Sequence, residues 1–221
     1  MRSTCNYDVS SAPSVNLLHA FLEPAFTLLG SPISLLEIVA FALSIVMVVL
    51  NMRVNPLAWP FSIVASVLYG WLFLDGKLYG EASLQLMFVI VSFWGWWQWL
   101  RGRADDGEKL HVQKLSNRGL VIALLITLAG WPLLGTFLAH ATDSPLPYWD
   151  ALPTVGSLVG QWLLGRKYEE NWPTWIAVNA ISVVLFALKG YWLTVVLYAV
   201  FIPMSAIGWR QWRAMRLAHT A

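Results

Sequence analysis

Seven stretches of this chain are almost free of charged side chains, and their length limits the folds that are open to it. Only Glu37 and Asp150 bring an acidic or basic side chain into any of them. The stretches cover residues 33–52, 57–74, 82–100, 119–140, 148–165, 172–188 and 190–209. Each is close to the roughly 20 residues that a helix needs to cross a bilayer. They lack the alternation of barrel strands, and only helices and closed barrels span lipid. The sequence therefore predicts an all-α membrane protein with seven transmembrane helices.

The composition excludes several other classes of protein. The chain has 221 residues, of which 58% are hydrophobic and 12% are charged, whereas an ordinary soluble domain carries about 25% charged residues. This balance excludes a disordered chain and an ordinary soluble enzyme. Cys5 is the only cysteine, so the chain can form neither an intrachain disulfide nor a thiolate metal site.

The N-terminal segment, residues 1–32, contains an apolar run over residues 15–30. This run also carries His19, Glu23 and Pro24, and proline disfavours a helix interior. We therefore expect an interfacial helix here and not an eighth span.

The basic residues predict the orientation in the bilayer. With seven spans and the N-terminus outside, eleven of the fourteen Lys and Arg residues fall on the cytoplasmic side. Only Arg2, Lys77 and Lys189 fall outside. Cytoplasmic loops carry the excess of positive charge in membrane proteins, so we expect an outside N-terminus and a cytoplasmic C-terminus.

An internal repeat relates residues 35–101 to residues 148–214 at a constant offset of 113 positions. Glu37 aligns with Asp150, acid for acid. The clearest matches are Trp59-Pro60 with Trp172-Pro173, and Gly95-Trp96-Trp97-Gln98-Trp99 with Gly208-Trp209-Arg210-Gln211-Trp212. We expect a three-helix repeat over residues 33–101, a cytoplasmic loop and linker helix over 102–145, a second repeat over 146–214 and a tail over 215–221. One linker span makes the two repeats parallel, a plan known in transporters whose substrate site lies near the midplane.

Polar residues recur at helical spacing inside the spans, where they are expected to face the bundle interior. The predicted substrate-binding residues are Gln85, Phe88, Asp150, Thr154, Ser157, Gln161, Trp172, Trp175, Asn179 and Tyr198. Aromatic rings can stack on a flat heteroaromatic ligand, and amides can hydrogen-bond its substituents. The alternative is structural, because Ser and Thr also serve helix packing, and Gln and Asn can bridge helices. We expect Trp96, Trp99, Trp209 and Trp212 to be interface-belt anchors.

No catalytic arrangement accompanies these residues. The four histidines, His19, His111, His140 and His219, fall in terminal or loop regions. The sequence contains no metalloprotease, nucleophile-elbow or phosphate-loop motif. We therefore expect a protein that is not an enzyme, with no cofactor, no metal ion and no nucleic-acid partner.

Several of these motifs resemble the PnuC family of bacterial vitamin transporters. The resemblance rests on Tyr148-Trp149-Asp150-Ala151, Gln161-Trp162-Leu163-Leu164, Asn171-Trp172-Pro173-Thr174-Trp175 and the Gly95–Trp99 stretch. It implies nicotinamide riboside as substrate, a fold like a full-length SWEET sugar transporter (three plus one plus three helices) and a homotrimer in the bacterial inner membrane. It also implies facilitated diffusion, with phosphorylation in the cytoplasm trapping the substrate. By motif, Gln85, Gln161, Trp172, Trp175 and Asn179 would bind the substrate.

Three alternatives remain open at this point. The chain could carry another flat vitamin such as thiamine, because relatives in this family are known for thiamine and riboflavin. It could capture a substrate for a larger energised complex. Coupling to protons through Glu37 or Asp150 is a weaker alternative, because the sequence places no second ionisable group within the other spans.

Overall fold

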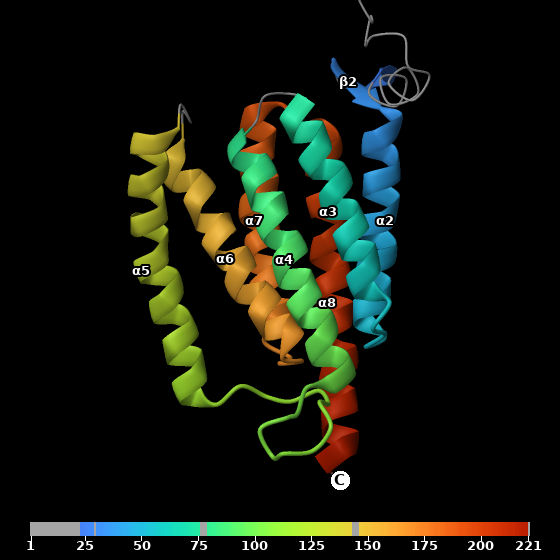
Figure 1. Cartoon of the computed structure of the whole chain (residues 1–221), viewed down its shortest axis with the longest axis vertical. Coiled ribbons are helices and arrows are strands. Elements are labelled where there is room, and N and C mark those ends of the chain that lie inside the picture. Colours follow the sequence, from blue (N-terminus) through green and yellow to red (C-terminus); the bar gives the residue numbers. More distant parts are fainter. Residues whose placement is uncertain (1–22, 29, 76–78, 143–145, 221) are drawn as a thin grey trace, which may run out of the picture.

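The computed structural model describes residues 23–28, 30–75, 79–142 and 146–220 (Figure 1). This part of the chain forms one β-hairpin and seven α-helices. The hairpin pairs β1 (Pro24–Leu28) with β2 (Ser31–Ser34). The helices are α2 (Leu35–Met52), α3 (Ala58–Asp75), α4 (Tyr79–Arg101), α5 (Asn117–Ala141), α6 (Pro147–Gly165), α7 (Asn171–Lys189) and α8 (Trp192–Thr220).

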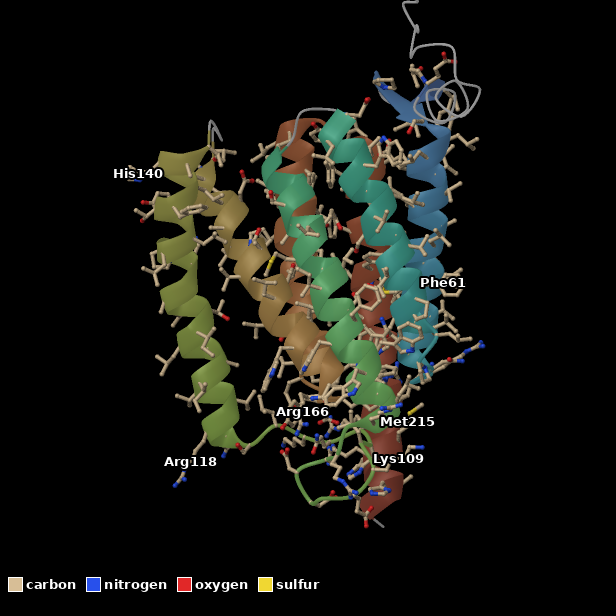
Figure 2. All side chains as sticks on the ribbon, viewed as in Figure 1. Phe61, Lys109, Arg118, His140, Arg166 and Met215 are labelled. Atoms are coloured by element: carbon tan, nitrogen blue, oxygen red, sulfur yellow. The ribbon has the colours of Figure 1, made fainter. Side chains whose placement is uncertain are left out.

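The helices run side by side as a bundle, with α5 at one edge, where it contacts α6 (Figure 1). The β-hairpin lies beyond the start of α2 and marks what we call the hairpin end. Residues 102–116, which connect α4 to α5, lie at the opposite end, which we call the loop end. Figure 2 shows Lys109 and Arg166 at the loop end and His140 at the hairpin end. Except for α4 and α5, helices that are adjacent along the chain pack together, and α2 also contacts α8 while α4 contacts α6.

The chain is a multi-pass membrane protein. The seven predicted helices are all present, and five of them, α2, α3, α5, α7 and α8, are long and apolar enough to cross a membrane. The other two, α4 and α6, contact each other. They carry amide and acidic side chains that a helix fully exposed to lipid would not tolerate.

The N-terminal prediction does not match the described residues. Pro24–Leu28 form a strand that pairs antiparallel with Ser31–Ser34, where the end of an interfacial helix was expected. Gly30 supplies the turn, with a φ of 85° that suits glycine. The remainder of the expected helix, residues 15–22, lies outside the described residues. At the other end of the chain, the predicted tail continues α8 as far as Thr220.

The repeat motif has the same packing role in both halves of the chain. The Trp59 ring lies against Gly95, where an added Cβ would come within 2.2 Å of it. The Trp172 ring lies against Gly208 in the same way, at 2.6 Å. Both glycines are therefore required by the close approach of an indole ring.

A second pair of tryptophans joins the two halves at the loop end. The Trp99 Nε1–H donates to the carbonyl oxygen of Leu164 at 3.0 Å, and the Trp212 Nε1–H donates to that of Asn51 at 3.0 Å. The donors are 113 positions apart, and so are the acceptors. Each half thus satisfies a backbone carbonyl of the other.

Two of the predicted interface anchors are buried instead. The exposed fraction is 3% for Trp99 and 0% for Trp212, so the belt prediction is wrong for these two residues. They pack edge to face on Trp59 and Trp172, with ring centroids 5.4 and 5.5 Å apart. The reason is that each ring points into the junction of the halves, where its N–H finds a carbonyl partner. Trp209, by contrast, is 38% exposed.

Candidate functional site

The predicted polar face of α6 is held by contacts along its length. Near the hairpin end, Asp150 Oδ1 lies 2.8 Å from the Lys189 Nζ at the end of α7, and both side chains are largely buried. The Thr154 hydroxyl donates to the carbonyl oxygen of Asp150 at 2.8 Å. Ser157 and Gln161 follow on the same face and are buried. The polar face of α6 therefore begins at the Asp150–Lys189 ion pair and ends at the buried amide of Gln161.

Gln161 takes part in a polar chain that crosses three helices. The Gln161 Nε2–H donates to Ser92 Oγ of α4 at 3.4 Å. The Ser92 hydroxyl is hydrogen-bonded to that of Ser62, on α3, at 2.9 Å. All three side chains are buried. This chain places an amide of the second half beside two hydroxyls of the first, as expected for polar groups inside a membrane bundle.

Asn179 of α7 is a predicted residue with unmet hydrogen-bonding capacity inside the bundle. Its exposed fraction is 2%, and its Oδ1 has no hydrogen-bond partner within the described residues. Leaving a buried polar acceptor without a partner costs about 1–3 kcal/mol. Such a cost is expected where a ligand supplies the missing donor.

Trp175 and Trp172 lie on the same helix but have different surroundings. A Cβ at Gly160 of α6 would lie 3.2 Å from Trp175 Cε2, so this ring packs across the junction of α6 and α7. Trp172 lies against Gly208 and Trp212 at the loop end. Its ring belongs to what we call the tryptophan cluster, formed by Trp59, Trp99, Trp172 and Trp212. The structure thus gives Trp172 a packing position equivalent to that of Trp59.

The predicted aromatic residue of α8 stacks within a small group of rings. Tyr198 is parallel to Phe186 of α7, with centroids 5.4 Å apart and an interplanar angle of 17°. It meets Phe201 edge to face at 6.4 Å. Gln85 and Phe88 of α4 are both partly buried. A Cβ at Gly70 would come within 3.3 Å of Gln85 Cβ, which places the stem of Gln85 close to α3.

A cavity of about 400 Å³ opens at the hairpin end, a volume within the range of small-molecule sites. Two acidic residues, Glu37 of α2 and Asp75 of α3, line it together with Lys189. Its aromatic lining includes Phe73, Tyr191 and Trp192. Acidic and aromatic side chains together suit a flat organic cation, because ring faces and carboxylates both attract positive charge.

Sequence reasoning missed two residues that contact the predicted polar face of α6. Lys189 was assigned only to the outside, yet it ends α7 and pairs with Asp150. Ser92 was not among the predicted residues, although it joins Gln161 to Ser62. Spacing along one helix reveals a shared face, but it does not reveal a partner on another helix. Neither contact could therefore be found from periodicity alone.

A family model and several proteins of known name match this chain. A family model described as "Nicotinamide mononucleotide transporter" matches residues 34–214. The chain is 26% identical over 176 residues to the nicotinamide riboside transporter PnuC of Escherichia coli, covering 69% of this chain and 74% of that protein. It is 29% identical over 193 residues to the riboflavin/roseoflavin transporter RibM of Streptomyces davaonensis, covering 85% and 89%.

A solved structure shares the fold. The crystal structure of a vitamin B3 transporter, PnuC, superposes with a TM-score of 0.72 at 26% identity. The match covers 84% of this chain and 83% of that one. The helical arrangement described above is therefore that of a membrane transporter, and the relatives named here are transporters too.

Proposed function

This chain belongs to the nicotinamide mononucleotide transporter family, and from that premise we propose that it carries nicotinamide riboside across a membrane. The observation that supports the assignment most is the buried Oδ1 of Asn179, which lacks a partner within the described residues. The carboxamide N–H and the ribose hydroxyls of nicotinamide riboside are donors that this oxygen could accept. We propose Gln161 and Trp175 as its neighbours in recognition, one through hydrogen bonds and the other through ring contact.

The charges favour a riboside over a nucleotide. The seven apolar stretches contain no Lys or Arg, and Lys189, which lies between the last two stretches, pairs with Asp150. A phosphate group carries about two negative charges near neutral pH, and their burial without a cation would be costly. Nicotinamide riboside instead carries one positive charge on its pyridinium ring. Glu37 and Asp75 line the cavity at the hairpin end, which we propose as the entrance for this cation.

Riboflavin is the second candidate substrate. The relative named as a riboflavin/roseoflavin transporter is 29% identical and covers 85% of this chain. Riboflavin is also flat and rich in hydrogen-bonding groups, but it carries no positive charge. The acidic lining of the entrance therefore separates the two candidates and favours the riboside.

The proposed architecture is two parallel three-helix repeats joined by the linker helix α5, as in a full-length SWEET transporter. The matched contacts support it, because Trp59–Gly95 and Trp172–Gly208 recur at the offset of 113 residues. We propose that the two repeats move relative to each other, opening the site alternately to each side. Transport is facilitated diffusion, and phosphorylation in the cytoplasm traps the product.

We further propose a bacterial inner membrane location with the loop end in the cytoplasm. The basic residues support this orientation, because Lys109, Arg118 and Arg166 lie at that end (Figure 2) and positive charge favours the cytoplasmic side. A homotrimer is proposed from the family resemblance. The outward face of α5 is apolar and largely exposed, with Leu124, Leu125 and Leu128 each more than half exposed, so it can meet lipid or a second subunit.

Titration calorimetry on the purified protein in detergent tests the substrate assignment. We expect nicotinamide riboside to bind, and the mononucleotide to bind at least about tenfold more weakly because its phosphate lacks a cation. Riboflavin and thiamine complete the panel. Preferential binding of riboflavin, or equal binding of the mononucleotide, would overturn the assignment.

The same titration tests the site. Asn179→Ala should weaken riboside binding by about tenfold or more, since the loss of one partner of a buried hydrogen bond costs about 1–3 kcal/mol. Trp175→Ala should also weaken it. The matched control is Asn117→Ala, which removes the same amide from the exposed start of α5. Unchanged affinity in both site variants, with an unchanged thermal midpoint, would refute the proposed site.

A further inference from the structure

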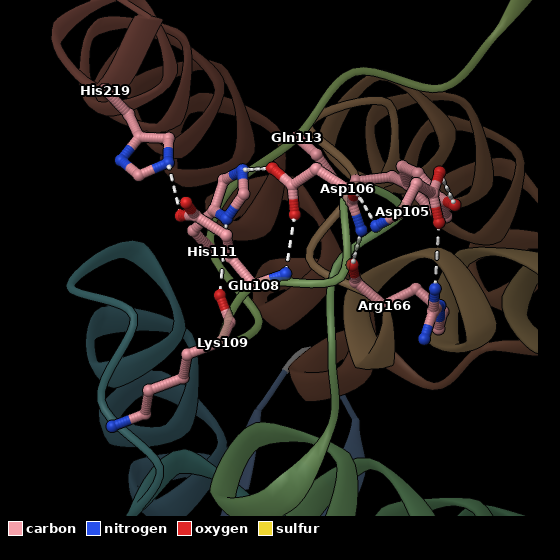
Figure 3. Close-up of polar contacts among 9 residues, drawn as sticks. Asp105, Asp106, Glu108, Lys109, His111, Gln113, Arg166 and His219 are labelled. Carbon is pink, nitrogen blue, oxygen red and sulfur yellow. Dashed lines mark hydrogen bonds and ion pairs between the residues drawn. The ribbon is translucent and has the colours of Figure 1, made fainter.

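Four potential metal ligands meet at the loop end, away from the transport interior (Figure 3). Asp106, Glu108 and His111 come from the connection between α4 and α5, and His219 comes from the end of α8. The connection turns tightly at Gly107, whose φ is 87°, and Ala104 N–H donates to the Glu108 carbonyl oxygen at 2.9 Å. This turn brings the three loop residues together beside α8.

The four ligand atoms are close enough to surround one ion. All lie within 4.8 Å of one another. His111 Nε2 is 3.5 Å from Asp106 Oδ2, and His219 Nε2 is 3.7 Å from Glu108 Oε2. Tetrahedral zinc with bonds of about 2.0–2.1 Å separates neighbouring ligand atoms by about 3.4 Å. Small side-chain rotations would therefore complete the geometry.

The orientation of His111 is also that of a metal ligand. Its Nδ1 lies 3.3 Å from the Lys109 carbonyl oxygen, and since a carbonyl can only accept, Nδ1 carries the hydrogen. In the neutral ring, this leaves the lone pair on Nε2, which faces Asp106. A hydrogen bond from the other ring nitrogen to a backbone carbonyl is the usual support for a metal-bound histidine. Asp106 is fixed as well, because its Oδ1 accepts from the Glu108 N–H at 2.9 Å.

We propose that Asp106, Glu108, His111 and His219 bind one divalent transition-metal ion of the zinc type. Two imidazoles and two carboxylates are donors that zinc accepts, whereas calcium and magnesium prefer oxygen ligands alone. The two carboxylates balance the charge of the ion. The ligands are reachable from solvent, because the exposed side-chain fractions of His111 and His219 are 22% and 46%.

The ion would join two segments that are distant in sequence, and one of them is already bound to a third. Gln113, in the same connection, already pairs with the turn between α6 and α7. Its N–H donates to the Lys167 carbonyl oxygen and its Nε2–H to that of Arg166, each at 3.0 Å. Bound metal would add the end of α8 through His219. The α4–α5 connection then becomes a bridge between the α6–α7 turn and α8.

Zinc binding is best measured on the full chain, purified with a tag that contains no histidine and stripped with a chelator. Calorimetry should give one Zn²⁺ per chain, and Ca²⁺ should not replace it. His111→Gln and His219→Gln should each weaken binding by at least about tenfold. The matched control is His140→Gln, because His140 is at the opposite end of the bundle (Figure 2) and its loss should change nothing.

A second measurement detects the bridge itself. Zn²⁺ should slow tryptic cleavage after Lys109 in the wild type and not in His219→Gln. The proposal fails if the wild type binds no Zn²⁺ at about 1 mM, if both histidine variants bind it as tightly as the wild type, or if Ca²⁺ binds equally well. None of these readouts depends on transport, so they are independent of the proposed substrate.

Discussion

Lys167 shows at the scale of one residue how the second half of the chain differs from the first. Its exposed fraction is 7%, its Nζ–H donates to the Leu110 carbonyl oxygen at 3.0 Å, and the Nζ lies 4.9 Å from the centre of a Trp99 ring. Its φ of 57° is matched by the 54° of Val54, 113 residues earlier. The same left-handed turn thus carries an apolar residue in one half and a cation in the other.

Burial, together with the nearby positive charge of Lys109, lowers the pKa of Lys167 from 10.5 to about 8. Between those two pKa values the unfolded chain holds the proton and the folded chain does not. Stability rises with pH wherever the unfolded state binds more protons. The contribution of Lys167 to stability therefore increases as the pH rises from about 8 toward 10.5.

Thermal unfolding of the wild type and of Lys167→Met at pH 7.5 and 9.5 tests this prediction. The wild-type midpoint should rise relative to the variant midpoint on going to the higher pH, because other groups titrate alike in both proteins. Lys114→Met, which removes an exposed lysine of the same connection, should follow the wild type. Parallel pH dependence in wild type and Lys167→Met would contradict the burial argument.

At the residue scale, the burial of part of the proposed site was predictable from the sequence. Asn179, Ser157 and Gln161 were identified from helical spacing, and all three are buried. Trp172 was selected by the same criterion, yet it packs on Gly208 and Trp212. Spacing identifies a face but not what lies opposite it, and Lys189 was missed as the partner of Asp150 for the same reason.

At the scale of elements, the repeated motif is explained by helix packing. The Trp59 ring occupies the space that a side chain at Gly95 would need, and the Trp172 ring does the same at Gly208. Each pair fixes the start of one helix against the next helix, α3 against α4 and α7 against α8. The five-residue motif thus sets the helix packing within each half.

Gly95→Ala and Gly208→Ala should each destabilise the protein by about 1–3 kcal/mol, because overpacking forces rings and backbone to shift. Chemical or thermal unfolding in detergent measures the effect. Trp59→Leu should relieve the clash at Gly95, so the double variant should be more stable than the sum of the two single changes predicts. Strict additivity would mean that the Trp59 ring does not limit the space at Gly95.

The sequence predicted helices better than it predicted the hairpin. Long stretches free of charge are a strong signal for spans, and seven helices are present in the described part of the chain. Residues 24–34 are also free of charge, but their run between Glu23 and Glu37 is too short to span a bilayer. Pro24 and Pro32 lie within the two strands, and proline in a strand removes a ladder hydrogen bond. Because the prolines argued against strands, the apolar run was interpreted as an interfacial helix.

At the scale of the whole molecule, the two halves are joined differently at the two ends. The loop end is closed by the tryptophan cluster and by two hydrogen bonds between the halves. These run from the Trp99 indole to the Leu164 carbonyl oxygen, and from the Trp212 indole to that of Asn51. The Arg216 Nε–H adds a 2.8 Å contact with the buried Glu169. The hairpin end instead contains the cavity lined by Glu37 and Asp75. This contrast is consistent with a transporter that is open at one end.

The offset of 113 residues was the sequence observation that predicted most about the whole molecule. It related Trp59 to Trp172 and Gly95 to Gly208 before any contact was known, and the structure gives both pairs the same packing. The asymmetry could not be predicted in the same way, because the contacts that Lys167 makes with Leu110, and Gln113 with Arg166, involve the α4–α5 connection. This connection has no counterpart in the alignment of the repeats. Orientation and the homotrimer stay predictions.

Uptake of labelled nicotinamide riboside into liposomes that contain only the purified protein tests the central claim most directly. We predict saturable uptake without ATP or a proton gradient, ending at equal concentrations inside and outside, and slowed by Asn179→Ala. A nicotinamide riboside kinase with ATP inside the liposomes should then drive further accumulation of label. No uptake above protein-free liposomes, at concentrations that the protein binds, would contradict the account, as would accumulation above equilibrium without the kinase.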